Sequence, residues 1–245
     1  MSELVRFERD GAIATLTLNR PAQRNALNLA LWAELDAHLY SIEAAGDAIG
    51  VVILAGEGPV FCAGNDLKER GAPAPRPNHQ ATIITRLANL PQPVIVAVQG
   101  GCYTGGLELA LAGDIIVAAE SARFADTHGA FALVPIWGMS QRLPRRVGQW
   151  RAREMSLTGL PVTGAEAARI GLANHCVPDA DLAARTRELA EAIAAQSRHS
   201  VLALKRLYRE QADLPLAAGL AHEVFSTAGV GPDFAERVAR RFGKA

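Results

Sequence analysis

Residues 100–115 read GGCYTGGLELALAGDI. Four glycines precede the apolar run LELALAG at 107–113, in which Glu108 is the single acid. Glycine adopts backbone conformations barred to other residues and lets the chain approach a ligand closely. If a helix begins near Gly105, Glu108 falls in its first turn, where the helix dipole stabilises an acid. Its neighbours Leu107 and Leu109 are apolar, however, and a helix that is apolar all round is buried. The stretch therefore predicts either a dipole-stabilised acid or a buried carboxylate with a pKa suited to proton transfer.

Three short apolar runs around this stretch are typical of buried strands. They are GVVILAG from residue 50, PVIVAV at 93–98 and DIIVAAE at 114–120, and helical patterns separate them. Short solid runs rich in β-branched residues indicate strands buried on both faces. Strands that alternate with helices pair in parallel through crossover connections. The expected fold class is therefore α/β.

The two ends of the chain differ in pattern. LVRFERDGAIATLTL alternates about Asp10-Gly11, which predicts a hairpin with its turn at that dipeptide. Asn28 is expected to cap the helix that follows it. From about residue 180 the pattern is helical to the C-terminus. The sequence thus predicts an α/β body at 1–180 and a helical region at 181–245.

The composition narrows the classes of function. The chain has 245 residues, of which 49% are hydrophobic and 20% charged, so a sizeable core is expected. The formal net charge is zero, whereas a nucleic-acid-binding surface usually shows as a basic excess. The chain has no secretory signal pattern, no apolar run near the roughly 18 residues that cross a bilayer, and three cysteines without metal-ligand spacing. We expect a cytoplasmic protein without a nucleic-acid or membrane partner and without a metal site.

Two of the predicted strands end in glycine-containing loops that lead toward helices. The loops read EGPVFCAGNDLKER and GCYTGGLELALAG. A helix start presents unpaired N–H groups, so two such loops at neighbouring strand ends could aim two N–H groups at one oxygen, as an oxyanion hole does. A phosphate loop of the GxxxxGK type needs a lysine, and Leu107 and Glu108 follow the glycines instead. A packing role for the glycines remains the alternative.

FCAGNDLKER and GGCYTGGLELALAGDI together resemble the signature of the crotonase, or enoyl-CoA hydratase/isomerase, superfamily. The resemblance extends from NRPAQRNAL through RFADTHGAF and WGMSQRLPRRVG to the tail, essentially the whole chain. It implies a spiral of repeated ββα units, with a C-terminal helical region used to form trimers that often pair into hexamers. It also implies a CoA thioester as the substrate and no separate cofactor.

The resemblance further implies roles for individual residues. The backbone N–H groups of Asn65 and Gly105 are expected to form the oxyanion hole that polarises the thioester carbonyl. Glu108 matches one of the two acids of the hydratases. The residues expected to bind the CoA moiety or the acyl group are Arg24, Ala63, Asp66, Leu67, Lys68 and Trp137.

The match is incomplete at the second acid. The hydratases carry it in a segment resembling FGQPE, and this chain has FADTH at 124–128, with His128 at the position of the acid. Hydration needs a water activated at the β carbon and a proton delivered at the α carbon. Three hypotheses follow: His128 transfers the proton in place of the acid, Asp126 reaches into the pocket, or the enzyme shifts a double bond with one base. Family isomerases often place their acid where His128 stands, which weakens the third.

Each of these residues also has a purely structural alternative. His128 could be satisfied by backbone contacts, Asp126 could cap a short helix, and Trp137 could be a core residue instead of the wall that shortens the acyl pocket. Decarboxylation, thioester hydrolysis and ring chemistry also occur in the superfamily. Two alternatives are not enzymes: a scaffold that binds acyl-CoA without turnover, and a relative that binds RNA. Because Glu108 is retained, we expect the site to be catalytically active and not a non-catalytic scaffold. The leading expectation is an enoyl-CoA hydratase that adds water to a 2-enoyl-CoA, with an isomerase as the main alternative.

Overall fold

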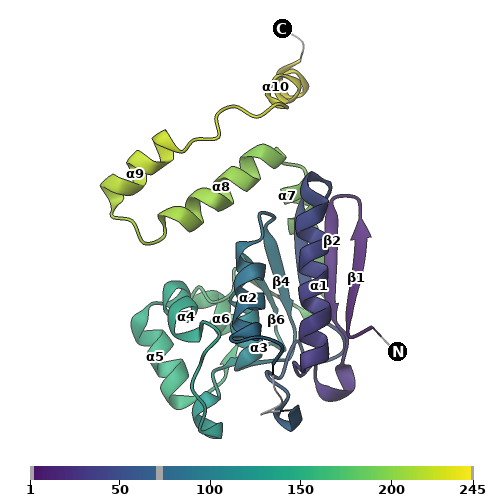
Figure 1. Cartoon of the computed structure of the whole chain (residues 1–245), viewed down its shortest axis with the longest axis vertical. Coiled ribbons are helices and arrows are strands. Elements are labelled where there is room, and N and C mark those ends of the chain that lie inside the picture. The colour runs from purple at the N-terminus through teal and green to yellow at the C-terminus, as the bar shows by residue number, and fades with distance from the viewer. Residues whose placement is uncertain (1–2, 70–73, 244–245) are drawn as a thin grey trace.

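A six-stranded sheet runs through the middle of the molecule (Figure 1). The computed structural model describes residues 3–69 and 74–243. In spatial order the strands are β1 (Val5–Asp10), β2 (Ile13–Leu18), β3 (Val51–Gly56), β4 (Val94–Val98), β6 (Ile115–Ala119) and β9 (His175–Val177). β1 and β2 are antiparallel, and every later pair is parallel. The three buried strands predicted from the apolar runs are confirmed.

A smaller sheet lies beside the first and gives the fold its repeat. It consists of β5 (Gly101–Tyr103), β7 (Arg123–Ala125) and β8 (Val162–Thr163). The chain places β4 in the large sheet and β5 in the small one, and then forms α3 (Gly105–Ala110). β6 and β7 repeat this step, which makes the spiral of ββα units that the resemblance implies. The predicted α/β class is confirmed.

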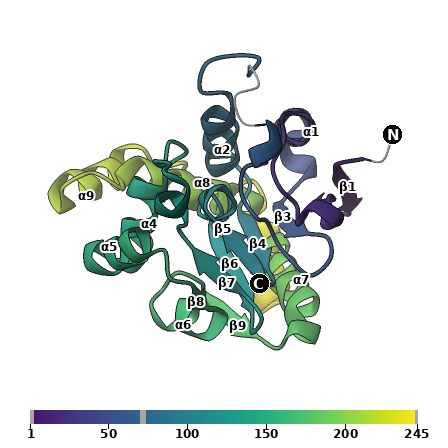
Figure 2. The same cartoon turned by 90° about the horizontal axis from the view of Figure 1, so that it is seen from below.

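Helices cover both faces of the large sheet. Figure 2 shows α1 (Leu29–Ala45) and α2 (His79–Asn89) on one side of the strands and α7 (Leu182–Ala194) on the other. Successive strand residues point to opposite faces, so Leu54 joins the core with α1 and α2 while Ile53 joins the core with α7. Burial on both faces explains why these strands are solid apolar runs.

Two local predictions near the N-terminus have different outcomes. The hairpin turn lies at Gly11 and Ala12, one residue later than predicted, because Asp10 pairs with Ile13 as the last rung of the ladder. Gly11 has a φ of +57°, the left-handed conformation that favours glycine. The predicted cap is confirmed, since the Asn28 side chain accepts a hydrogen bond of 3.0 Å from the N–H of Leu31.

The last three helices stand off from the sheet body (Figure 1). They are α8 (Arg198–Gln211), α9 (Leu216–Phe225) and α10 (Phe234–Phe242), and none of them contains a buried residue. α7 lies within the predicted helical region yet packs against the sheet. The division at residue 180 stays a prediction. No helix among the described residues has the length and hydropathy needed to cross a bilayer.

Three further helices follow β7 and build the side of the molecule next to α3. They are α4 (Met139–Val147), α5 (Gln149–Thr158) and α6 (Gly164–Arg169). α4 and α5 pack against each other, and α3 packs against α4. The connection between β7 and α4 contacts the start of α3 through Trp137, whose N–H donates to Glu108. The site described next lies at this contact.

Candidate active site

The two glycine-containing loops meet at one cavity. Cys62, in the loop after β3, pairs with Cys102 of β5, and the N–H of Cys62 donates to the carbonyl oxygen of Gly101 at 3.0 Å. Asn65 and Gly105 both line a cavity of about 300 Å³. Among the described residues, neither backbone N–H donates to an acceptor. Two unpaired donors on one cavity wall have the arrangement that binds a developing oxyanion.

Glycines at both loops permit this close approach. Gly64 has a φ of +97°, and a Cβ added there would lie 2.9 Å from the carbonyl oxygen of Tyr103. A Cβ added to Gly105 would lie 3.4 Å from the nitrogen of Asn65 and 2.4 Å from ring carbon Cζ3 of Trp137. The backbones can approach this closely only because these side chains are absent. Gly64 and Gly105 therefore allow the two loops to pack against each other at the cavity wall.

Thr104 is a part of the site that the sequence did not reveal. Its φ of +52° is unfavourable for a β-branched residue, and such outliers concentrate at functional sites. Its N–H donates to Ala125 at 2.9 Å, and its hydroxyl hydrogen-bonds the hydroxyl of Thr127. These bonds to β7 and the segment after it hold the residue that immediately precedes Gly105. The only available signal was its position before the helix start.

Glu108 is buried in the first turn of α3, with 1% of its surface exposed. Its Oε1 accepts hydrogen bonds from the backbone N–H groups of Trp137 at 2.9 Å and Met139 at 3.1 Å. Burial raises the pKa of Glu108, and these two bonds and the nearby His128 only partly offset it. Of the two sequence interpretations, the structure favours the buried carboxylate with a raised pKa.

His128 faces Glu108 across the cavity. It begins the 3₁₀ helix His128–Phe131 after β7, and its Nε2 lies 3.7 Å from Oε2 of Glu108. Its Nδ1 lies 2.6 Å from Oδ1 of Asp126. Glu108 and His128 both line the cavity, whereas Asp126 is not among the lining residues and lies behind His128. The structure thus brings all three predicted catalytic side chains together, with Asp126 outside the pocket.

The rest of the cavity wall is mostly apolar and comes from the connection between β7 and α4. Sequence reasoning singled out only Trp137 from this segment, although FALVPIW is a visible apolar run. Trp137 is 9% exposed and packs edge-on against Trp32 with ring centroids 5.3 Å apart, so it is both a core residue and a wall. The other apolar lining residues of this connection are Ala132, Leu133, Val134 and Ile136.

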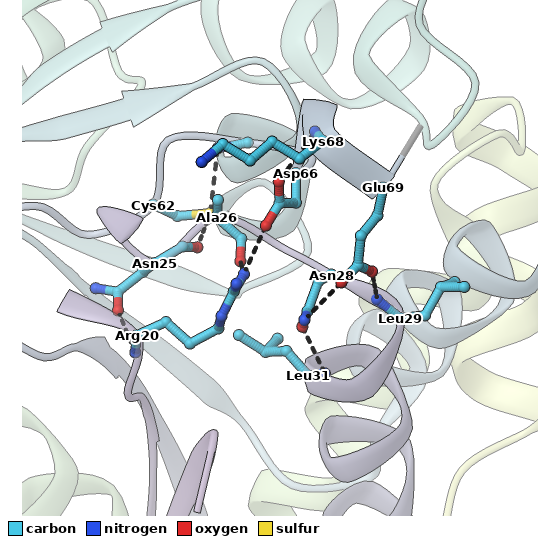
Figure 3. A network of polar contacts seen from close by, with 11 residues as sticks. Arg20, Asn25, Ala26, Asn28, Leu29, Leu31, Cys62, Asp66, Lys68 and Glu69 are labelled. Carbon is cyan, nitrogen blue, oxygen red and sulfur yellow. Dashed lines mark hydrogen bonds and ion pairs between the residues drawn. The ribbon is translucent and has the colours of Figure 1, made fainter. Parts of the chain in front are cut away.

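The segment expected to bind CoA is held by polar contacts to the region before α1 (Figure 3). The Asp66 carboxylate pairs with Arg20 at 3.0 Å and accepts the N–H of Lys68 at 3.1 Å. The N–H of Ala63 donates to the carbonyl oxygen of Arg24 at 2.9 Å, and the Arg24 side chain is exposed. Arg20 was not predicted, although it stands in the same NRPAQRNAL motif as Arg24.

Leu67 and Lys68 belong to the 3₁₀ helix Leu67–Glu69 at the end of this segment. Glu69 fixes it to α1, because its carboxylate accepts the N–H of Leu29 and the side-chain amide of Asn28, both at 3.1 Å (Figure 3). Leu67 remains 47% exposed.

A cavity lined by two backbone N–H groups without acceptors among the described residues, with a buried carboxylate beside them, suits an enzyme that handles a carbonyl substrate. The chain belongs to the enoyl-CoA hydratase/isomerase family, whose model matches residues 8–228. It therefore acts on CoA thioesters, and the resemblance seen in the sequence is confirmed.

Individual relatives agree with this assignment. A protein of Arabidopsis thaliana named "Probable enoyl-CoA hydratase 1, peroxisomal" is 36% identical over 218 residues, which are 88% of this chain and 82% of the relative. The 1,2-epoxyphenylacetyl-CoA isomerase of Escherichia coli is 33% identical, covering 100% of this chain and 97% of its own. The crystal structure of enoyl-CoA hydratase from Bacillus anthracis superposes with a TM-score of 0.92 at 35% identity, covering 98% and 96%.

Proposed function

We propose that this protein is an enoyl-CoA hydratase that adds water across the double bond of a 2-enoyl-CoA. The observation that carries the proposal is the pair formed by Glu108 Oε2 and His128 Nε2, 3.7 Å apart on the cavity wall. One water can contact both atoms at ordinary hydrogen-bond lengths. In this proposal His128 takes the place of the second acid, which is the first of the three hypotheses.

The remaining geometry supports the same reaction. With the thioester oxygen between the N–H groups of Asn65 and Gly105, electron density moves from the β carbon toward that oxygen. Water then adds at the β carbon, and the α carbon of the resulting enolate takes up a proton. Loss of one such donor elsewhere costs about 2.7–4 kcal/mol of transition-state stabilisation, so the pair is a major contributor. The raised pKa of Glu108 lets it hold a proton at higher pH than an exposed glutamate does.

The test is to incubate the protein with crotonyl-CoA and follow the absorbance of the conjugated thioester. Hydration predicts its loss together with a product heavier by one water, and both should depend on Glu108. Conversion of a 3-enoyl-CoA to a 2-enoyl-CoA without hydration would instead assign the isomerase. Binding of CoA esters without any reaction would assign the scaffold.

The proposal includes the CoA-binding roles of Arg24, Ala63, Asp66, Leu67 and Lys68. Arg20 supports this segment through Asp66, and both side chains of the pair are nearly buried. We expect Arg20→Gln to raise KM for the CoA ester by roughly tenfold, which corresponds to about 1.4 kcal/mol, with kcat nearly unchanged. Steady-state kinetics measure both constants.

The matched control is Arg9→Gln, since the hydrogen bonds of Arg9 within the described residues go to the carbonyl oxygens of Gly11 and Ala48 and not to residues 63–68. It should leave KM as it is. A fall in kcat at constant KM in Arg20→Gln would contradict the assigned role of the segment.

We also propose a homotrimer, or a hexamer of paired trimers, formed through α8–α10. These helices bury no residue within the chain yet carry large exposed apolar side chains. Such patches mark association surfaces. The exposed apolar residues of these helices and their connections are Leu204, Tyr208, Leu214, Leu216, Leu220, Val224, Phe225, Val230, Phe234, Val238 and Phe242.

Phe225→Glu is expected to lower the oligomer mass in light scattering, because Phe225 is 86% exposed in the single chain and a charge would oppose its burial. Glu223→Gln, a one-unit charge change on the same helix, should leave the mass unchanged. An unaltered mass for Phe225→Glu would place the interface elsewhere.

A cytoplasmic location, the lack of a cofactor beyond the CoA of the substrate, and the lack of a nucleic-acid partner stay part of the proposal. The plant relative is named as peroxisomal, so cell fractionation is the relevant measurement. Within the described residues, no group of three or more His, Cys, Asp or Glu side chains is placed to hold a metal ion.

A further inference from the structure

We propose that Asp126 is a positioning residue that holds His128 in the tautomer protonated at Nδ1, so that His128 acts as the base and Glu108 as the acid of hydration. This inference rests on the proposed function and goes beyond it by dividing the two roles. It also replaces the hypothesis that Asp126 reaches into the pocket.

The contact between Asp126 and His128 determines where the imidazole proton lies. Oδ1 of Asp126 is 2.6 Å from Nδ1, and the same oxygen accepts the backbone N–H of His128 at 3.2 Å. A carboxylate can only accept, and a neutral imidazole has one N–H. The proton therefore sits on Nδ1, and Nε2 presents a lone pair to the cavity. Asp126 is 2% exposed, so water does not compete for this bond.

Asp126 remains an acceptor because its surroundings stabilise its charge. Burial alone would raise the pKa of Asp126, but hydrogen bonds from the His128 ring, the Ser156 hydroxyl and the His128 N–H outweigh it and lower the pKa. The charged groups that face His128 and Glu108 are few. Within the described part of the chain they are each other, Asp126 and Arg142 of α4, which donates to the carbonyl oxygen of Trp137 at 2.8 Å. The charge of Glu108 raises the pKa of Arg142 and partly offsets the lowering by burial.

The two oxygens of Glu108 are not equivalent, and this assigns its proton. Oε1 already accepts two backbone N–H groups, from Trp137 and Met139. If Oε1 carried the proton, its O–H hydrogen would point toward those N–H groups or leave too few lone pairs to accept both. A proton on Glu108 therefore resides on Oε2. That oxygen faces the cavity and His128. The acid is therefore Oε2–H of Glu108, and the base is Nε2 of His128.

The step balances with these assignments. The water oxygen bonds to the β carbon and loses one proton to His128 Nε2, and the π electrons shift to the thioester oxygen as the enolate forms. The α carbon then takes the proton from Glu108 Oε2, which leaves a carboxylate beside an imidazolium that Asp126 stabilises. Transfer of one proton from Nε2 back to Oε2, directly or through a water, restores the starting state.

The first test measures the tautomer without turnover. Nitrogen-15 NMR of protein labelled at histidine reports which ring nitrogen carries the proton, and the signal missing from His128→Gln identifies His128. The expected result is a proton on Nδ1 in the wild type and a shift of the proton to Nε2 in Asp126→Asn. A proton on Nε2 in the wild type would overturn the inference.

The second test separates positioning from a structural role. Asp126→Asn is expected to lower kcat by about 10²–10⁴-fold with little change in KM, in line with the loss of an orienting aspartate in a protease triad. In the His128→Glu background, which has no imidazole to orient, the same Asp126→Asn change should not lower the rate again. An equal loss in both backgrounds would show that Asp126 acts on the fold and would overturn the inference.

The two proposals fail in different ways. Absence of hydration in the wild type would remove the proposed function, while the NMR result would still decide the tautomer. Hydration with Asp126→Asn at the wild-type rate would retain the proposed function and overturn the role of Asp126. Melting temperatures of all variants show whether a loss of rate comes from unfolding.

Discussion

Glu108→Gln is expected to lower kcat for hydration by about 10²–10⁴-fold, the usual contribution of a positioned acid or base. A glutamine cannot give or take the proton, but its carbonyl oxygen can still accept the N–H groups of Trp137 and Met139 that Oε1 accepts now. The shape of the site is therefore preserved. Steady-state kinetics with crotonyl-CoA measure the loss.

The control for this variant is Glu154→Gln, the same change at an exposed position of α5. It should keep the wild-type rate. Calorimetric titration with CoA should show that Glu108→Gln still binds the nucleotide part of the substrate. A variant that binds CoA and retains more than a tenth of the wild-type kcat would remove Glu108 from proton transfer.

The same variant makes a prediction about stability and pH. Burial raises the pKa of Glu108 in the folded chain above its ordinary value of 4.5, so folding favours the protonated form. This contribution to stability is complete below the unfolded pKa and is lost as the pH rises through the folded pKa. Glutamine does not titrate. The difference in melting temperature, variant minus wild type, should therefore increase as the pH rises above about 4. A difference that does not change with pH would contradict the raised pKa.

Gly105→Ala is expected to lower kcat by about 10²–10³-fold, as for loss of one oxyanion-hole donor. The new Cβ would lie 2.4 Å from Cζ3 of Trp137 and 3.4 Å from the nitrogen of Asn65. Real carbon contacts do not reach 2.4 Å, so the ring or the start of α3 must move, and the two N–H groups lose their common target. The fall should appear in kcat more than in KM, because the donors stabilise the enolate more than the substrate.

Two further variants sharpen this experiment. Gly129→Ala is the control, since a Cβ at Gly129 meets nothing within 4 Å and its φ is not positive. Adding Trp137→Leu to Gly105→Ala removes the ring that the Cβ strikes, so the loss should shrink. If Gly105→Ala alone hydrates as fast as the wild type, the N–H of Gly105 is not an oxyanion donor.

Features with a local cause could be predicted from the sequence. The strands at 51–56, 94–98 and 115–119 followed from solid apolar runs, because strands covered by helices on both faces need apolar residues at every position. The cap at Asn28 followed from one side chain that reaches its own helix. The burial of Glu108 was one of two interpretations of its apolar neighbours, and the structure favours it.

Features that depend on contacts across the chain could not be predicted. The hairpin turn was placed one residue early, because the register is set by the ladder from Val5 to Leu18 and not by the turn dipeptide alone. Arg20 was not predicted because its partner Asp66 lies 46 residues away in the sequence, on the other side of β3.

The sequence by itself determined the class of fold, the two glycine-containing loops and the presence of one acid in an apolar setting, since periodicity and residue type carry that information. Only the tertiary structure decided where the His128 side chain lies relative to Glu108. Asp126 and His128 are two residues apart, but whether either side chain enters the pocket depends on the 3₁₀ turn that follows β7. That turn packs against α5, while Glu108 comes from the neighbouring ββα unit. Distances between side chains from different units are set by packing, which no local pattern encodes.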